Sequence, residues 1–273
     1  MFTAGKVEAV DTVAPPAMDT SVQIHEPHHP LLSPSIQRVV GEQIAAFELK
    51  FLVEERLAQE IQRWATTRMQ PDAYADPALG GAYQTTTLYL DTPARDVFHR
   101  SPGQRGRKFR LRRYGSEQQV HLERKTRRGD QVKKRRSQVP LEELALLATV
   151  TQPPLWPGEW FGQRIAAQNL RPACLITYER MAYVQLSSDG PLRLTLDRQI
   201  RGVASEVWDL TPVATGQSIL PSHVVCEFKF RGALPNLFKE LIHALQLEAG
   251  SVSKYRRTML QTAAAGGEGP SNA

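Results

Sequence analysis

The chain has 273 residues, of which 41% are hydrophobic and 23% charged, a composition typical of a globular protein with a substantial core. It has no run of about 18 apolar residues that would span a bilayer, and Cys174 and Cys226 are too few for a disulfide framework and lack metal-site spacing. We therefore expect a reduced, cytoplasmic protein without a transmembrane segment, for which any membrane association would require a membrane-protein partner.

The formal charge of +6 indicates an anionic partner because the basic residues are concentrated in one part of the chain. Residues 105–136 contain fourteen basic residues and three acidic ones, so the rest of the chain is net acidic. This basic stretch alternates charged and apolar residues, as strands packed into a fold do and a solvated basic tail does not. The cations are therefore expected to face something inside the fold.

The two ends of the chain differ from its centre. Residues 1–40 are rich in Pro, Ala, Ser, Thr and His without apolar periodicity, and the last residues are small and polar. We expect a disordered N-terminal tail over residues 1–40, one domain over residues 41–260 and a disordered C-terminal tail over residues 261–273.

Two amphipathic helices and eight strands are predicted between the tails. Residues 54–70 and 234–250 have apolar residues at helical spacing, and we interpret Gly250 as the stop of the second helix. Residues 141–170 are expected to form a helical or loop insertion. The strand candidates follow one another as hairpin neighbours and cover residues 47–53, 83–92, 108–115, 120–126, 131–139, 174–186, 192–200 and 223–232.

Five of these strands, over residues 47–51, 108–114, 120–126, 192–200 and 224–230, have a charged face and an apolar face. In KFRLRRY, for example, Lys108, Arg110 and Arg112 alternate with apolar residues. The same alternation places the following residues on the charged faces of other strands: Glu48, Lys50, His121, Glu123, Lys125, Arg193, Thr195, Asp197, Glu227 and Lys229. The predicted fold class is therefore α+β, an antiparallel sheet flanked by amphipathic helices. If the sheet closes into a barrel, the charged faces line its lumen.

A lumen with many cations requires a compensating anion. Two like charges about 4 Å apart repel by roughly 4 kcal/mol at an effective dielectric constant near 20. Arg bonds phosphate oxygens in pairs and Lys acts as a mobile point charge, so a mixture of the two suits a row of phosphate groups. Glu48, Glu123 and Glu227 are available to balance part of the charge or to hold Mg²⁺ or Mn²⁺ together with phosphate.

Two other interpretations of the basic strands remain open from this pattern. One is a solvated basic face that balances acidic residues elsewhere, and the other is a face that binds nucleic acid. The nucleic-acid interpretation is less favoured because the aromatic residues of the charged strands lie on the opposite face, away from any base that would stack on them.

Eight motifs between Phe47 and Arg257 resemble a known family. In chain order they are FELKFLV, TLYLDT, KFRLRRYG, LERKT followed by KKRR, YERMAY, RLTLD, CEFKFRGALP and SKYRR. Together they resemble the VTC domain (vacuolar transporter chaperone type) of polyphosphate polymerases, within the triphosphate tunnel metalloenzyme superfamily. The resemblance implies an antiparallel eight-stranded β-barrel whose charged tunnel binds a linear phosphate chain. It also implies transfer of the terminal phosphoryl group of ATP to polyphosphate with Mn²⁺ or Mg²⁺ as cofactor, and nucleic acid is not expected as a partner.

The resemblance also implies roles for individual residues. Glu227 in CEFK matches the metal carboxylate, and Ser253 and Lys254 in SKY match the motif at the phosphate being transferred. Lys50 in FELK is expected to act with them as a catalytic residue and a phosphate ligand. The remaining phosphate ligands are expected to be Arg110, Arg112, Lys125, Lys134, Arg136, Tyr178, Arg180, Arg193 and Lys229.

One departure bears on the reaction. Tunnel triphosphatases of the CYTH type have a Glu-x-Glu-x-Lys motif on the first strand, whereas AFELK has Ala46 in place of the first acid. The loss of one metal carboxylate favours the VTC type. A tunnel-type triphosphatase and a non-catalytic module that binds or senses polyphosphate are the alternative functions.

Overall fold

The computed structural model describes residues 46–128, 131–149, 153–213 and 216–266, all within the unit Gly41–Ala273. The tail predicted over residues 1–40 lies outside the described residues. In the described ranges, no helix is both long enough and apolar enough to cross a membrane.

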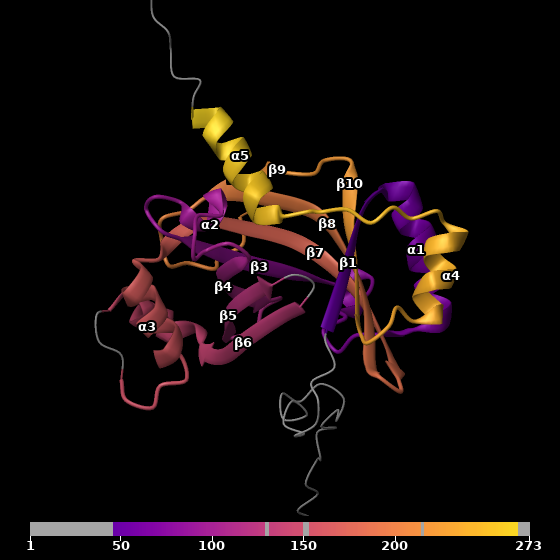
Figure 1. Ribbon diagram of the computed structural model, residues 1–273, viewed down its shortest axis with the longest axis horizontal. Helices are drawn as coiled ribbons and strands as arrows, with labels where there is room; N and C mark the ends of the chain where they lie inside the picture. Colours follow the sequence, from indigo (N-terminus) through magenta and orange to yellow (C-terminus); the bar gives the residue numbers. More distant parts are fainter. Residues whose placement is uncertain (1–45, 129–130, 150–152, 214–215, 267–273) are drawn as a thin grey trace, which may run out of the picture. The chain divides into compact units, whose positions relative to one another are not determined.

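One antiparallel sheet contains all eight predicted strands (Figure 1). In spatial order they are β1 (Ala46–Glu54), β10 (His223–Arg231), β8 (Gly190–Ala204), β7 (Arg171–Ser187), β3 (Ala82–Asp91), β4 (Arg107–Tyr114), β5 (Gln119–Arg128) and β6 (Gln131–Pro140). The short strands β2 (Gln70–Pro71) and β9 (Gln217–Ser218) pair with β7 and β8. The α+β fold class is confirmed.

The expectation of a closed barrel is wrong in one respect. Among the described residues no backbone pairing joins β6 to β1, so the sheet stays open between these two strands. Side chains make a connection on its charged face instead: Lys125 Nζ of β5 lies 2.7 Å from Glu48 Oε2 of β1. The charged faces of distant strands therefore approach one another although the ladder is incomplete.

Helices α1 (Glu55–Arg68) and α4 (Asn236–Ala244) cover the apolar face of β1, β10 and β8 (Figure 1). Ile61 of α1 and Phe238 of α4 are fully buried in this layer, and the Phe238 ring stacks on Phe228 of β10 at 4.4 Å between centroids. Because both helices present an apolar stripe to the strands, they place the charged alternate residues of these strands on the opposite, inner face.

The second helix ends earlier than predicted. Gln246 adopts a left-handed conformation with φ of 49°, and the Leu247 N–H donates to the Ile242 carbonyl at 2.9 Å, which closes the helix. Gly250 is therefore not the helix stop. Its N–H donates to the Lys50 carbonyl at 2.7 Å and attaches the following segment to β1.

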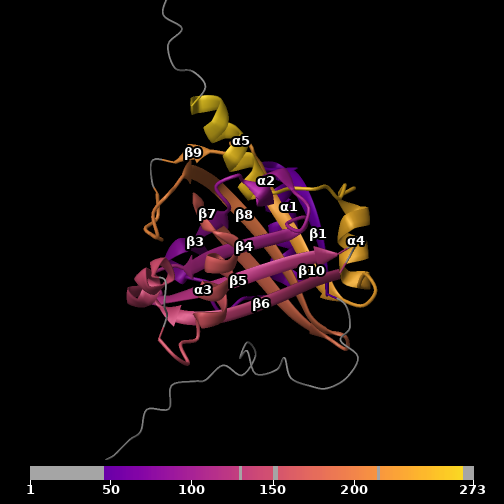
Figure 2. The same ribbon diagram turned by 60° about the vertical axis from the view of Figure 1, so that its left-hand side comes forward.

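The segment 141–170 forms a helical insertion, as expected. It contains the 3₁₀ helix η3 (Leu141–Ala148) and the helix α3 (Glu159–Gln168), which contact β5 on the outer face of the sheet. Phe161 of α3 packs near Phe109 of β4, with 6.4 Å between the ring centroids. Figure 2 shows β4, β5 and β6 side by side next to α3. The shorter elements η2 (Pro77–Leu79) and α2 (Asp96–His99) flank β3.

Helix α5 (Lys254–Gly266) is absent from the sequence prediction. It corrects the expectation that the chain is disordered from residue 261, and residues 267–273 of that expected tail lie outside the described residues. The helix packs on β7 and β8 with Thr258 buried. Gly202 of β8 permits this approach, because a Cβ atom at that position would lie 2.5 Å from Thr258 Oγ1. The hydroxyl of Tyr255 also donates to the Asp91 carboxylate of β3.

Replacing Gly202 with Ala is expected to destabilise the protein by about 1–3 kcal/mol, because the added methyl group overlaps Thr258 and forces α5 away from β8. Thermal unfolding measures the change. Gly250→Ala is the control, since nothing lies within 4 Å of a Cβ atom there, and its effect should stay within about 0.5 kcal/mol. Equal melting temperatures for the two variants would show that this contact does not hold α5 in place.

Candidate functional site

The charged faces of the strands surround a narrow cavity of about 60 Å³, called the inner cavity below. Its walls come from strands on both halves of the sheet and from the start of α5. The lining cations are Lys50, Lys108, Arg110, Arg112, Lys125, Arg180, Lys229 and Lys254, and the lining carboxylates are Glu48 and Glu227. The excess of cations gives the inner cavity a positive potential, which favours an anion over a cation or a neutral group.

Most of the predicted site residues meet in this cavity. The predicted residues that line it are Lys50, Arg110, Arg112, Lys125, Tyr178, Arg180, Glu227, Lys229, Ser253 and Lys254. They lie up to 204 positions apart in the sequence, from β1 to α5. Strand alternation therefore identified the charged face, and the fold brings the residues of that face together.

Three predicted phosphate ligands are not in the cavity lining. Lys134 and Arg136 of β6 contact the buried Glu123 carboxylate, and their side chains are 40% and 35% exposed. Arg193 of β8 donates to Asp72 Oδ2 at 2.5 Å and to the Tyr83 hydroxyl at 3.0 Å. Each of these cations already has a carboxylate partner outside the cavity lining.

Strands β1 and β10 contribute two acids and two cations that alternate. Glu48 is opposite Lys229, and Lys50 is opposite Glu227. Lys50 Nζ lies 2.7 Å from Glu48 Oε1 and 3.6 Å from Glu227 Oε2, and Lys229 Nζ lies 2.6 Å from Glu227 Oε1. Burial and the charge of Glu227 oppose ionisation of Glu48, but the neighbouring lysines hold its pKa at about 2. Burial also opposes ionisation of Glu227, and Lys229 and Lys50 nevertheless hold its pKa well below the usual range.

Glu123 of β5 organises the cations of the neighbouring strands. Its side chain is fully buried, and Arg110 donates to Glu123 Oε2 at 2.6 Å while Lys134 Nζ lies 2.6 Å from Oε1. Arg136 Nε donates to the same Oε1 at 2.7 Å. Burial opposes ionisation, but Arg110 and Lys134 hold the pKa of Glu123 well below its usual range. An ionised carboxylate thus fixes three cations around one point.

Asp197 of β8 likewise holds two cations in place, at the start of α5. Arg180 donates to its two oxygens at 2.6 and 2.8 Å, and Lys254 Nζ donates at 2.6 Å. Burial opposes ionisation of Asp197, yet Arg180 and Lys254 hold its pKa far below the usual range. The Ser253 hydroxyl accepts the Arg256 N–H at 3.3 Å and caps the helix, so the positive end of α5 lies at the cavity.

Arg112 and Lys108 are the exceptions to this compensation. Arg112 is 6% exposed and donates to Thr87 Oγ1 at 3.1 Å, and Lys108 Nζ donates to Ser253 Oγ at 3.2 Å. Within the described part of the chain neither forms an ion pair with a carboxylate. Burial, together with the nearby Lys50, lowers the pKa of Lys108 to about 8. These two cations lack a counterion that a bound anion would supply.

Sequence reasoning missed three residues of this site. Lys108 and Asp197 were placed on the charged face but received no role, although their parity matches that of Arg110 and Arg193. Tyr89 lines the cavity and accepts a hydrogen bond from Arg110 at 3.4 Å. Its position in YQTTTLYLDT, on the same face of the strand as Thr85 and Thr87, was the available signal. Burial opposes ionisation of Tyr89, but Arg110 and Lys108 lower its pKa to about 8.

The carboxylates fit a divalent cation only together with phosphate oxygens. In the described ranges no group of three or more His, Cys, Asp or Glu side chains is arranged to hold an ion. Glu48 and Glu227 both contact Lys50, and Mg²⁺ typically takes one or two carboxylates and completes its shell with phosphates and water. Glu227 and Glu48 therefore suit a metal that arrives with a phosphorylated substrate.

The sequence matches the VTC domain family over residues 45–263. The chain belongs to the VTC domain family. The matched span of this VTC domain includes every strand of the sheet and every residue that lines the inner cavity. A search of curated proteins found no match.

Solved structures similar to this VTC domain share little sequence with it. One is the putative adenylyl cyclase HpAC1 from Hippeastrum, which has a dominant triphosphatase activity. The two sequences are 11% identical, the TM-score is 0.47, and the aligned region covers 80% of this chain and 96% of the HpAC1 chain. A putative adenylate cyclase from Bacillus halodurans is 12% identical with a TM-score of 0.47, covering 77% and 94%. The PH1819 protein from Pyrococcus horikoshii OT3 is 12% identical with a TM-score of 0.43, covering 79% and 98%.

Lys108→Gln is expected to weaken the binding of inorganic tripolyphosphate about tenfold at pH 7 and much less at about pH 9.5. The pKa of Lys108 is about 8 in the free protein, so the ammonium charge that attracts the anion is present below this pH and is lost above it. Isothermal titration calorimetry at the two pH values gives the ratio of wild-type to variant affinity. Taking this ratio cancels the titration of the anion itself.

The control for this experiment is Lys239→Gln, which removes an exposed lysine on α4 and should change neither affinity. A wild-type to Lys108→Gln ratio that is the same at both pH values would contradict a titrating Lys108 in the site.

Proposed function

We propose that this VTC domain is an ATP-dependent polyphosphate polymerase, which transfers the terminal phosphoryl group of ATP to the end of a polyphosphate chain in the inner cavity. Membership of the VTC family supports the class of reaction. The cations of the inner cavity support a polyanionic substrate. ATP and polyphosphate are the proposed ligands, and Mn²⁺ or Mg²⁺ is the proposed cofactor.

The observation that carries the proposal is the uncompensated pair Arg112 and Lys108 inside a cavity whose other cations are held in place by carboxylates. Burying a cation without a counterion is costly, and a polyanion would remove that cost. The paired cations are oriented before a ligand binds, so they lose little freedom on binding. Such an arrangement suits a row of phosphate groups better than a single small anion.

The proposed reaction needs alignment and charge neutralisation more than covalent chemistry from the protein. The nucleophile is a terminal phosphate oxygen of polyphosphate, which is already ionised at neutral pH, so no general base has to remove a proton. This oxygen forms a bond to the γ-phosphorus of ATP while the bond from that phosphorus to the β,γ-bridging oxygen breaks. ADP leaves with the electron pair.

In our proposal, different residues of the inner cavity align the phosphate groups and neutralise their charge. Lys254, fixed by Asp197 at the positive end of α5, would neutralise charge on the transferred phosphoryl group, with Ser253 beside it. Arg110 and Arg112 on β4 would hold successive phosphates through their paired donors. Strand alternation spaces these two side chains along one face, which suits the repeat of a linear chain.

Glu227 is the carboxylate proposed to hold the metal, with Lys50 and Lys229 beside it to bind the same phosphates. When bound, Mn²⁺ or Mg²⁺ would neutralise charge on the phosphoryl oxygens. Ala46 stands where a tunnel triphosphatase of the CYTH type has a further acid. This difference disfavours hydrolysis and is one reason why the polymerase is preferred.

The test is to incubate the purified protein with ATP and Mn²⁺ and to follow ADP release together with polyphosphate on a gel. Lys254→Ala is expected to lower the rate by about 100-fold or more, because it removes a charge placed at the transferred group. The variant should still fold, since Arg180 continues to bond both oxygens of Asp197. Glu227→Gln should lose activity at every Mn²⁺ concentration. Lys239→Ala is the matched control on α4 and should keep the wild-type rate.

The remaining outcomes separate the alternatives. Orthophosphate release from tripolyphosphate without polymer would identify a hydrolase. No turnover combined with a melting temperature that rises on addition of polyphosphate would identify a binding or sensing module. Full activity in Lys254→Ala would contradict the role given to that residue.

A further inference from the structure

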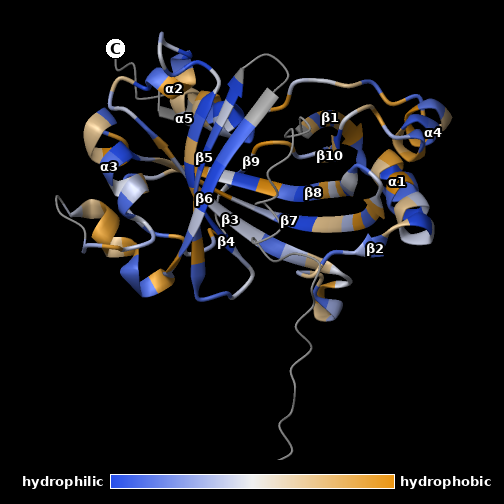
Figure 3. Ribbon diagram, turned by 60° about the horizontal axis from the view of Figure 1, so that its bottom comes forward, coloured by the Kyte–Doolittle hydropathy of each residue, from blue (hydrophilic) through white to orange (hydrophobic). Residues whose placement is uncertain are grey.

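The three most basic strands carry cations on both faces. On the outer face, Arg107, Thr126 and Lys133 form one row across β4, β5 and β6. Phe109 and Arg124, followed by Arg135, form the next row. These residues have the parity opposite to that of the inner cavity, so they face away from it. In Figure 3 much of β6 has hydrophilic colouring, as expected of a strand with charge on both sides.

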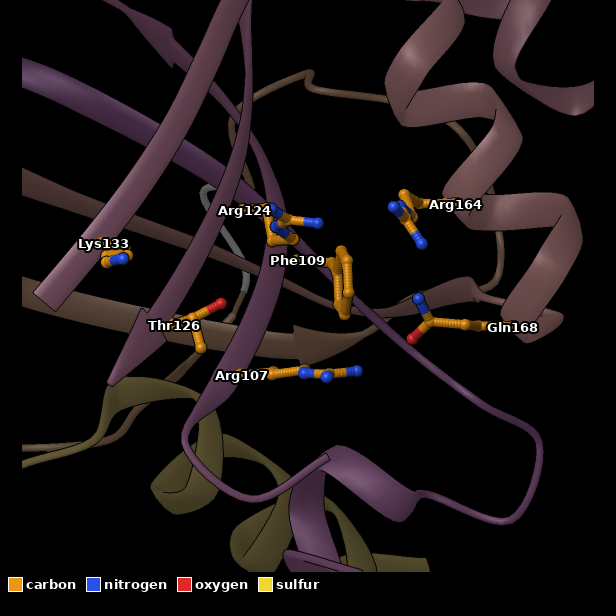
Figure 4. Close-up of a pocket in the computed structure, with 7 residues that line it drawn as sticks. All are labelled: Arg107, Phe109, Arg124, Thr126, Lys133, Arg164 and Gln168. Carbon is orange, nitrogen blue, oxygen red and sulfur yellow. The ribbon is translucent and has the colours of Figure 1, made fainter. Parts of the chain in front are cut away.

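Helix α3 completes a pocket over this outer face. The pocket has a volume of about 420 Å³, and its lining residues are Arg107, Phe109, Arg124, Thr126, Lys133, Arg164 and Gln168. In Figure 4 the side chains of Arg124 from β5 and of Arg164 from α3 point towards the space beside the Phe109 ring. Gln168 lies one helical turn after Arg164 and therefore faces the same space.

The pocket contains four cations and no carboxylate. In the part of the chain that the structure describes, Arg107, Arg124 and Lys133 form no ion pair, and neither does Arg164 of the helix. Burial and then the charge of Arg164, with smaller contributions from Arg135 and Arg107, lower the pKa of the Arg124 guanidinium. This shift reflects like charges that converge without compensation, the condition that a multiply charged anion relieves.

We propose that this outer pocket is a second anion site, which takes a small molecule carrying several phosphate groups, of the class of inorganic tripolyphosphate. Three guanidinium groups offer paired donors to phosphate oxygens, and the Lys133 ammonium adds a mobile charge. The volume of the pocket falls in the range of about 300–1,000 Å³ that is usual for small-ligand sites. Four cations from three strands and a helix converge on one space, which suits a compact ligand with more than one phosphate.

A nucleic acid fits this surface less well. Recognition of single strands relies on aromatic side chains on which bases stack. Phe109 is 1% exposed, and the Trp160 ring is already covered by the Arg135 guanidinium at 4.3 Å. The pocket thus offers charge and hydrogen-bond donors without an open stacking surface.

The inference does not rest on the proposed function, because the outer pocket and the inner cavity share no residue. The strands separate the two sites, so both are able to hold an anion at once. Variants can therefore be chosen that alter one site and leave the side chains of the other unchanged.

The experiment is isothermal titration calorimetry of the full chain with tripolyphosphate, without divalent metal and at fixed ionic strength. Wild type is expected to show two classes of site. Lys133→Glu combined with Arg164→Glu should weaken one class about tenfold or more, because two attractive charges become repulsive, and should leave the other class unchanged. Both side chains are exposed, so the exchange is compatible with folding, which equal melting temperatures would verify.

The matched control is Arg63→Glu combined with Lys239→Glu, which makes the same charge change at exposed positions on α1 and α4. This control variant should bind tripolyphosphate at both classes of site with wild-type affinity. The neutral pair Lys133→Gln and Arg164→Gln should weaken the same class as the charge reversal, by a smaller factor. Agreement between these variants would separate a local effect of the pocket from the change in net charge.

Each of the remaining outcomes either supports or overturns the outer site. Wild-type binding in the Lys133→Glu, Arg164→Glu variant would overturn the outer site. A single class in wild type that this variant abolishes would support the outer site and contradict a phosphate-binding inner cavity. Orthophosphate that binds the pocket as tightly as tripolyphosphate would overturn the requirement for several phosphates. A single-stranded oligonucleotide that loses affinity in the variant while tripolyphosphate does not would show a nucleic-acid surface and overturn the proposal.

Discussion

The structure depends on buried carboxylates that hold cations of like charge close together. Glu123 and Asp197 are both fully buried, and each accepts bonds from cations of two or more elements. Removing one partner of such a buried pair usually costs about 3–5 kcal/mol, because it leaves an uncompensated charge. The acids are therefore what allows a sheet with so many cations on its inner face to fold before any ligand is present. They also fix the direction of the guanidinium and ammonium groups.

The carboxylates do not neutralise every cation of the inner cavity, and the unpaired cations bear on what the cavity could bind. Arg112 and Lys108 line the same cavity without a carboxylate partner among the described residues. Residues that lower the stability of the free protein are common where a ligand restores it. The inner cavity thus contains cations that carboxylates already orient in the free protein and cations that have no carboxylate partner among the described residues. Both properties favour an extended anion, and this is the physical basis of the polymerase proposal.

Strands β4, β5 and β6 use their two faces differently. On the inner face buried Glu123 pairs with Arg110 of β4 and with two cations of β6. On the outer face Arg124 and Lys133 share a pocket with Arg164 and no acid. Helices η3 and α3 cover the apolar residues of that outer face and leave the basic rows accessible. The basic stretch over residues 105–136 therefore contributes cations to two separate surfaces.

The sequence by itself determined the eight strands, the first helix and the family, because strand alternation and helical spacing are local properties of neighbouring residues. It also determined which parity is charged, and most predicted site residues consequently line one cavity. The tertiary structure decided which cations have partners, since Lys254 and Asp197 are 57 positions apart and Arg193 and Asp72 are 121 apart. It likewise decided the open edge of the sheet, the docking of α5 on Gly202 and the outer pocket. Ion pairing and helix docking depend on contacts between distant segments, and local periodicity carries no information about those contacts.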